Sequence, residues 1–331
     1  MNSWFSIKGA ALAIFFVLVP LVTAAVAEDG LRFLVFGDAP YTGRQIEILK
    51  KTDAPAIQNA DYSFLIHVGD FKSGGELCTD ALIKERYDQL MAFRPGRVFY
   101  TPGDNEWADC DRPYLKQRFS EVERLNHLRG LIRSRPMKLP VDWQYATQTE
   151  FPENARWTKG NVMFATVYIV STNDGREEIL MDEIEPTLDL VDARDRANRA
   201  WLRAAFDAAR KSDSGAVVIA TQADVTKIAG SAPCSEIVRV QCDAFAAFRD
   251  LLLRLAAGFK KPVLLVHGDT NPFCLDKSFG GDTAPLLWRL NALGDFSEVD
   301  ATAIKVQLDG EQNPFTVIPL MTGGSVGRRC P

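Results

Sequence analysis

The chain has 331 residues, of which 47% are hydrophobic and 24% are charged, and its formal net charge is −5 at pH 7. This length suits one large domain or two small ones, and the hydrophobic fraction is ample for a core. A nucleic-acid partner is disfavoured, because phosphate backbones are bound by clustered Lys and Arg and the sequence has no basic stripe. A small phosphorylated substrate is not excluded, since a bound metal ion would reverse the local charge.

The N-terminal segment has the pattern of a signal peptide. Lys8 precedes an apolar stretch at residues 11–22, and small residues then lead to Ala27. A basic flank, an apolar core and an Ala-x-Ala site are typical of a cleaved leader, and a retained membrane anchor is the alternative. No later segment approaches the roughly 18 uninterrupted apolar residues of a membrane span. We expect residues 1–27 to be removed and residues 28–331 to form a single exported domain, periplasmic or secreted.

Strand and helix patterns alternate along most of the chain, which predicts an α/β fold. The predicted strands cover residues 31–36, 62–68, 97–102, 161–172, 216–222 and 262–267. The predicted helices cover residues 42–60, 78–93, 113–133, a segment starting near 192, and a segment from the cap Asp243 to Gly258. Residues 137–159 are expected to be a long ordered loop. Residues 301–308 and 315–320 have no helix between them, which predicts an antiparallel pair finishing a second sheet.

Four of the predicted strands end on a Gly-Asp pair: Gly37-Asp38, Gly69-Asp70, Gly103-Asp104 and Gly268-Asp269. In open α/β sheets, ligands and metals lie beyond the carboxyl ends of the strands, so these carboxylates can converge on one place. Glycine permits a tight turn and close backbone approach, while aspartate supplies a short oxygen donor. Ordinary turn chemistry explains one such pair. Four of them indicate a metal site.

The six cysteines all follow residue 27, and an even count in an exported chain favours disulfides. None has the Cys-x-x-Cys spacing of a structural zinc site. One bridge would join the loops after the second and third Gly-Asp pairs, a second would close a short local loop, and the third takes the remaining two. Among about 15 connectivities, we therefore expect Cys78–Cys110, Cys234–Cys242 and Cys274–Cys330.

With these strand ends in place, the chain resembles the calcineurin-like metallophosphoesterases. The stretches that carry the resemblance are Asp38-Ala39-Pro40, Gly69-Asp70, Gly103-Asp104-Asn105-Glu106, Gln222 and Gly268-Asp269-Thr270-Asn271. The chain is also similar to a divergent exported bacterial branch of that family at residues 40–41, 100–107, 151–154 and 266–270. The resemblance implies an α/β fold of two packed mixed β-sheets flanked by helices, a four-layer sandwich.

The resemblance also implies a metal-ligand set, and here every donor in it is oxygen. We expect one divalent cation held mainly by Asp70, Asp104, Asp269 and Gln222, and a second, weaker ion at Asp38 with Asn271. Carboxylate and amide oxygens favour Mn, Mg or Ca over Zn or Fe. The chain departs from the family pattern at Pro40, which has no side-chain donor, and at Asn271, where an amide replaces imidazole.

The expected chemistry is hydrolysis of a small phosphate ester by metal-activated water. Asn105 stands where the family has its general acid, and it could hydrogen-bond a phosphoryl oxygen. His267 is the better replacement acid-base of the two histidines that precede Gly-Asp pairs, although a buried structural role is the alternative for both. Asn173 could bind substrate, with a turn role as its alternative. Glu106 is expected to hold backbone amides.

The sequence allows one alternative function and excludes another. A non-catalytic metal- or ligand-binding protein on the same scaffold is favoured by Pro40, Asn105 and Asn271, whereas the four aspartates favour an enzyme. A dinucleotide-binding protein is excluded because no Gly-x-Gly-x-x-Gly follows the first strand. Without a placed general acid, the enzyme is expected to prefer good leaving groups, such as those of diphosphates or activated esters.

Overall fold

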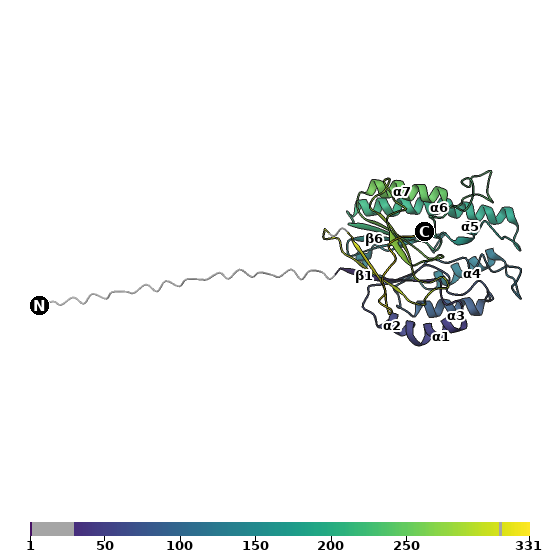
Figure 1. Cartoon of the computed structure of the whole chain (residues 1–331), viewed down its shortest axis with the longest axis horizontal. Helices are drawn as coiled ribbons and strands as arrows, with labels where there is room; N and C mark the ends of the chain where they lie inside the picture. Colours follow the sequence, from purple (N-terminus) through teal and green to yellow (C-terminus); the bar gives the residue numbers. More distant parts are fainter. Residues whose placement is uncertain (2–29, 311–312) are drawn as a thin grey trace.

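The computed structural model describes Met1, residues 30–310 and residues 313–331. Apart from Met1, the predicted signal peptide lies outside the described residues. Two β-sheets pack face to face, and helices cover the outer face of each (Figure 1). This confirms the prediction of two packed mixed sheets flanked by helices. In the described part of the chain, no helix is long and apolar enough to span a membrane.

The first sheet has the strand order β12-β11-β1-β2-β3. Its strands are β1 (Leu31–Phe36), β2 (Leu65–His67), β3 (Val98–Tyr100), β11 (Thr302–Val306) and β12 (Phe315–Pro319). The first three are parallel, and β11 and β12 form the predicted antiparallel pair. The prediction that this pair finishes a second sheet is wrong. Strand β11 pairs with β1, where Ile304 and Val306 join Phe33 and Val35 in the core between the sheets.

The second sheet has the strand order β4-β5-β6-β7-β8-β10-β9. Its strands are β4 (Ala146–Thr147), β5 (Ala155–Lys159), β6 (Val162–Thr166), β7 (Ala216–Ala220), β8 (Val263–His267), β9 (Cys274–Asp276) and β10 (Leu287–Asn291). Strands β6, β7, β8 and β10 are parallel. The predicted loop 137–159 is wrong in part, since it contains β4 and β5, where Trp157 is buried between the sheets.

Helices α1 (Gly43–Ile48), α2 (Ala54–Asn59), α3 (Asp80–Met91) and α4 (Glu121–Ser134) cover the first sheet, and a π-helical segment, Leu49–Asp53, joins α1 to α2 (Figure 1). Helices α6 (Ile184–Lys211) and α7 (Ala246–Phe259) cover the second sheet. Helix α4 starts later than predicted, because the Ser120 hydroxyl caps it by accepting from the Glu123 amide. Helix α6 starts earlier, at Ile184.

Alternation along the strands divides the core into layers. Phe33 and Val35 of β1 face the second sheet, whereas Leu34 and Phe36 face the helices. The rings of Phe99 and Trp157 stack across the two sheets with centroids 3.4 Å apart. Because both faces of the strands are fixed by packing, their carboxyl ends are held at one edge of the sandwich.

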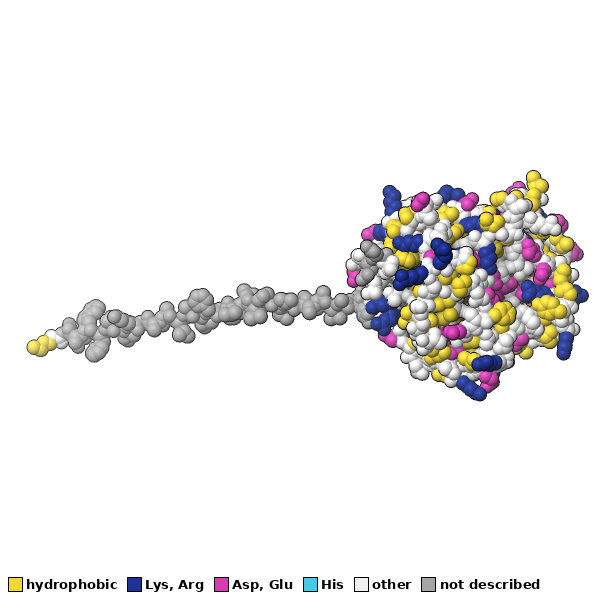
Figure 2. All heavy atoms as spheres, in the orientation of Figure 1, with side chains coloured by type: hydrophobic (Ala, Val, Ile, Leu, Met, Phe, Trp, Pro, Cys, Tyr) yellow, Lys and Arg dark blue, Asp and Glu magenta, His cyan; other side chains and the backbone are white. Residues whose placement is uncertain are grey.

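The three predicted disulfides are confirmed as Cys78–Cys110, Cys234–Cys242 and Cys274–Cys330, and the described residues include no free cysteine. The first bridge joins the loop after β2 to the loop after β3. Lys and Arg side chains are interspersed with acidic and hydrophobic ones over the face seen in Figure 2, without a continuous basic stripe.

Loss of the Cys78–Cys110 bridge is expected to cost more stability than loss of Cys234–Cys242. The bridges close loops with sequence separations of 32 and 8, for which chain entropy gives about 4 and about 2.5 kcal/mol. Urea unfolding of Cys78→Ala/Cys110→Ala and Cys234→Ala/Cys242→Ala proteins would measure both values. The reverse order of stabilities would contradict the expectation.

Candidate metal centre

The candidate site lies where β1, β2, β3 and β8 end. Asp38, Asp70 and Asp104 are buried and Asp269 is half-buried, each in the turn that follows its strand. The φ angles of Asp38, Asp70 and Asp269 are 51°, 59° and 59°. Aspartate tolerates this left-handed conformation better than most residues. The backbone thus turns sharply after each strand and leaves the carboxylate at the strand end.

Three of these carboxylates converge. One oxygen from each of Asp38, Asp70 and Asp269 lies within 4.8 Å of the others. The amide of Asp269 donates to Asp38 Oδ1 (2.9 Å), while Asp38 Oδ2 is buried and has no hydrogen-bond partner. Asp70 accepts from the Tyr41 hydroxyl (3.0 Å) and from the backbone amide of Asn105 (3.1 Å). Side chains from three distant parts of the sequence therefore face one small volume.

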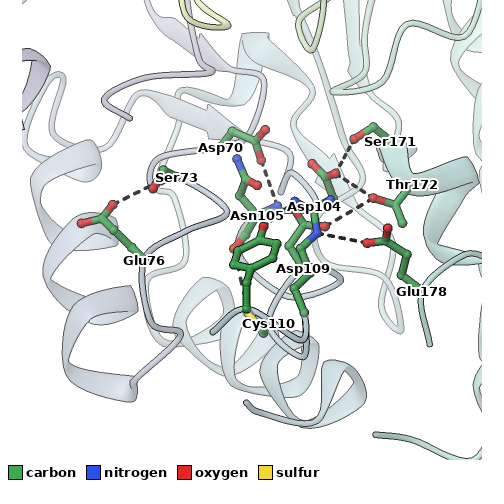
Figure 3. Close-up of polar contacts among 12 residues, drawn as sticks. Asp70, Ser73, Glu76, Asp104, Asn105, Asp109, Cys110, Ser171, Thr172 and Glu178 are labelled. Atoms are coloured by element: carbon green, nitrogen blue, oxygen red, sulfur yellow. Dashed lines mark hydrogen bonds and ion pairs between the residues drawn. The ribbon is translucent and has the colours of Figure 1, made fainter. Parts of the chain in front are cut away.

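Asp104 lies beside this group and is held by hydroxyls (Figure 3). Ser171 Oγ and Thr172 Oγ1 donate to its Oδ2 at 2.5 and 2.8 Å. Gln222 links the two sets, because its Nε2 donates to Asp70 Oδ2 (3.3 Å) and to Asp104 Oδ1 (3.2 Å). Its Oε1 accepts from the Ser171 amide (2.8 Å). Gln222 thus presents its donor to the carboxylates in this structure.

Two glycines make the close approach of these groups possible. A Cβ on Gly268 would lie 1.8 Å from Asp38 Oδ2, and a Cβ on Gly103 would lie 1.9 Å from Asp70 Oδ1. Any larger side chain at either position must displace the carboxylate or the strand end. The glycine at one strand end therefore leaves room for the aspartate at another, Gly268 for Asp38 and Gly103 for Asp70.

The carboxylates repel one another in a buried place. Burial raises the pKa of Asp38 well above its usual value, and the charge of Asp269 raises it further. Burial also raises the pKa of Asp70 and Asp269, and in both cases the charge of Asp104 adds to the effect. The group is therefore costly as a set of anions, and a bound cation would relieve that cost.

An open cavity of about 360 Å³ lies over the carboxylates. Its lining includes Asp70, Asp104 and Asp269 on the acidic side, and Arg112 is the one cation among its described lining residues. Arg112 is already paired, with Nη1 2.8 Å from Asp109 Oδ2 and Nε 3.0 Å from Glu178 Oε2. The cavity therefore remains acidic overall.

The remaining predicted residues differ in position. The side chain of Asn105 lines the cavity. Asn271 is exposed, and its Nδ2 donates to the carbonyl (2.6 Å) and carboxylate (3.0 Å) of Asp295. Glu106 is buried and, as predicted, accepts from the backbone amides of Phe71 (2.8 Å) and Gly103 (3.0 Å). Its carboxylate therefore joins the turns after β2 and β3.

Asn173 and His267 are occupied elsewhere. The amide group of Asn173 donates to the Cys242 carbonyl (2.7 Å) and accepts from the Ala244 amide (3.1 Å). His267 is fully buried, with Nδ1 2.9 Å from the Gly268 carbonyl oxygen and Nε2 accepting from Arg289 Nε (3.0 Å). Burial lowers the pKa of His267 to about 4. Neither Asn173 nor His267 lines the cavity over the carboxylates, and the roles predicted for them stay predictions.

Sequence reasoning missed the hydroxyl groups of Tyr41, Ser171 and Thr172. Ser171 and Thr172 belong to α5 (Ser171–Gly175), a short turn in which Thr172, Asn173 and Asp174 all have positive φ. A signal was available, because these residues stand at the end of the predicted strand 161–172. The structural strand β6 stops at Thr166, and the chain then continues toward the site.

Comparison with known proteins leaves the family open. No family model and no curated protein matches the sequence. Solved structures with a related course of the chain include PhoD, at 10% identity over 91% of this chain and 73% of that one, with a TM-score of 0.48. Purple acid phosphatase PPD1 from yellow lupin (Lupinus luteus) seeds is 9% identical, and the match covers 90% of this chain and 52% of that one with a TM-score of 0.49. GAP50, the anchor in the inner membrane complex of Plasmodium, is 12% identical, and the match covers 92% of this chain and 90% of that one with a TM-score of 0.46. Similarity of this degree establishes neither family nor activity.

Substitution of Gly268 tests the packing of the site. Gly268→Ala is expected to lower the free energy of unfolding by about 1–3 kcal/mol, as overpacking of a core does, because its Cβ would overlap Asp38. Gly43→Ala is a matched control, since Gly43 has open space around it. Urea unfolding of both variants measures the effect. Equal stability of the two would contradict the close approach described here.

Proposed function

We propose that the protein is an exported, metal-dependent phosphoesterase of divergent metallophosphoesterase type. One observation carries the proposal. Three carboxylates from three strand ends approach within 4.8 Å of one another beside an open cavity. Structural acids are normally paired with cations or hydrogen-bond donors. Here Asp38 Oδ2 is buried with neither, and a cation held between the three aspartates would supply the missing partner.

A divalent cation fits this set of donors. Asp38, Asp70 and Asp269 would hold it, with Asp104 alongside, and all of them offer oxygen. Oxygen donors favour Mg, Mn or Ca. When bound, such an ion supplies two effects, activation of water and neutralisation of phosphoryl charge.

The chain's own residues would orient the reacting groups. Tyr41 and the Asn105 backbone amide fix Asp70, while Ser171 and Thr172 fix Asp104. These bonds set which carboxylate oxygens remain free. The Asn105 side chain lines the cavity and would donate to a phosphoryl oxygen of the substrate. An amide cannot deliver a proton to a leaving alkoxide, so Asn105 would bind without acting as an acid.

Export is part of the proposal. Three disulfides in the described residues suit an oxidising compartment. The predicted signal peptide at residues 1–27 would direct the chain there. The protein would then act on small phosphorylated compounds in the periplasm or outside the cell.

The activity test compares the wild-type mature protein with Asp70→Asn. Hydrolysis of p-nitrophenyl phosphate and bis-p-nitrophenyl phosphate would be followed with Mn, Mg, Ca, Zn or a chelator. Asp70→Asn keeps the size of the side chain but removes its charge, so metal-dependent turnover is expected to fall by at least about a hundredfold, more than changes to outer-shell partners usually cost.

Asp282→Asn, an exposed acid away from the cavity, is the matched control and is expected to retain full activity. Equal turnover in Asp70→Asn and the wild-type protein would contradict the proposed site. No turnover with any ion, together with Mn binding that Asp70→Asn abolishes, would favour the non-catalytic binding protein instead.

Leaving-group dependence provides a second prediction. No histidine lines the cavity among the described residues, and the Asn105 amide cannot transfer a proton to the leaving group. Without an imidazole to protonate the leaving oxygen, the rate should fall steeply as the pKa of the leaving group rises. Initial rates on a series of substituted aryl phosphates measure this slope. A flat dependence would show that a group on the protein supplies the proton.

A further inference from the structure

We propose that the mouth of the cavity is an aromatic subsite that binds a flat ring on the organic part of the substrate. Its three rings are those of Tyr41, Tyr114 and Phe296, which all line the cavity over the carboxylates. The inference rests on the proposed function for the identity of the reacting bond. It adds the class of substrate, a phosphate ester whose organic group carries an aromatic ring.

The position of Tyr41 joins the subsite to the metal centre. Its hydroxyl donates to Asp70 Oδ2 at 3.0 Å, and its ring lies 4.9 Å from that of Phe296, centroid to centroid, with the planes 58° apart. A phosphoryl group at the carboxylates would therefore have these rings as immediate neighbours. The organic group of an ester bound there must pass along them.

Two of the three rings at the mouth are largely open to solvent. Phe296 is 76% exposed and Tyr114 is 64% exposed. Large exposed apolar side chains that rim a polar cavity commonly mark a place where a ligand binds. Base and aryl groups stack on such rings without requiring a particular hydrogen-bond pattern.

The turn that carries Phe296 is held in place by the site. Asp295 and Phe296 have φ angles of 48° and 62°, a conformation that is disfavoured for a bulky residue. The Asp295 amide donates to the Asp38 carbonyl (3.0 Å), and Asn271 donates to the Asp295 carbonyl (2.6 Å). These bonds fix a conformation in which the Phe296 ring faces the cavity instead of the core.

Charge on the cavity lining argues against a second phosphate as the recognised group. Arg112 is the one cation among the described lining residues, and it is already paired with Asp109 and Glu178. Its Nη1 also donates to the Tyr114 hydroxyl (3.1 Å), so it orients that ring. Apart from acidic side chains, the mouth offers a set of aromatic faces. An aryl ester and a nucleotide share the flat ring that these faces would bind.

The cavity volume is compatible with either compound. About 360 Å³ lies near the lower end of the range of roughly 300–1,000 Å³ for small-molecule sites. An aryl ester places its ring directly on the leaving oxygen, beside Tyr41. A nucleotide places its base one sugar further out, toward Phe296 and Tyr114.

The test measures kcat/KM for phenyl phosphate, adenosine 5′-monophosphate and glycerol 3-phosphate with Mn²⁺. Phe296→Ala is expected to lower the values for the two aromatic esters about tenfold, the effect of one lost stacking contact, and to leave glycerol 3-phosphate unchanged. Phe296→Trp is expected to restore the aromatic preference. Val141→Ala, which truncates a side chain 95% exposed and away from the cavity, is the matched control.

The outcomes separate the subsite from the proposed function. Equal loss on all three esters, or no preference for aromatic esters in the wild-type protein, would overturn the subsite while leaving the phosphoesterase intact. If the protein shows no turnover, the subsite is tested by calorimetric measurement of phenylphosphonate and methylphosphonate binding in the presence of Mn²⁺. A preference for phenylphosphonate that Phe296→Ala removes would support the subsite even then, and equal affinity for the two probes would refute it. A larger loss on phenyl phosphate than on the nucleotide would identify the aryl ester as the better fit.

Discussion

The mutual repulsion of buried carboxylates is the constraint on which the rest of the site depends. Three aspartate oxygens within 4.8 Å of one another favour protonation or separation of the groups unless a cation is bound, and the scaffold prevents only the separation. The scaffold does hold them. Fixed strands end at the same edge, and Gly103 and Gly268 leave room for the neighbouring aspartates. Because the groups cannot move apart, a bound cation would relieve the repulsion that otherwise favours their protonated forms.

The turns after β2 and β3 show how that arrangement is maintained. Glu106 accepts from amides in both turns, at Phe71 and Gly103, and the Cys78–Cys110 bridge joins the loops that follow them. Burial raises the pKa of Glu106 to about 7, although the Phe71 amide opposes the rise. A covalent link and a buried carboxylate thus fix the same pair of turns. Together they determine where Asp70 and Asp104 lie.

Much of this could be predicted because it follows from local pattern. Gly-Asp after an apolar run indicates a strand end, and ligands of α/β folds lie beyond the carboxyl ends of the strands. Here three such ends belong to the first sheet and the fourth, after β8, belongs to the second. The contacts that tune the site could not be predicted in the same way. Ser171 and Thr172 reach Asp104 because the backbone of α5 turns with positive φ angles. Strand β5 was not predicted because its segment is rich in Pro and Trp and has no clear strand pattern. Packing against the other sheet, as at Trp157, decided what local propensity left open.

The departure at Asn271 connects the metal centre to the cavity mouth. Imidazole at this position would offer one ring nitrogen to an ion, whereas the Asn271 amide donates two hydrogen bonds to Asp295. Those bonds fix the turn that presents Phe296 beside Tyr41, and Tyr41 in turn bonds to Asp70. Loss of a strong metal donor at Asn271 therefore need not mean loss of function. The same position supports the residues that would contact the organic part of a substrate, so under the proposed function one loop would influence both ion affinity and substrate choice.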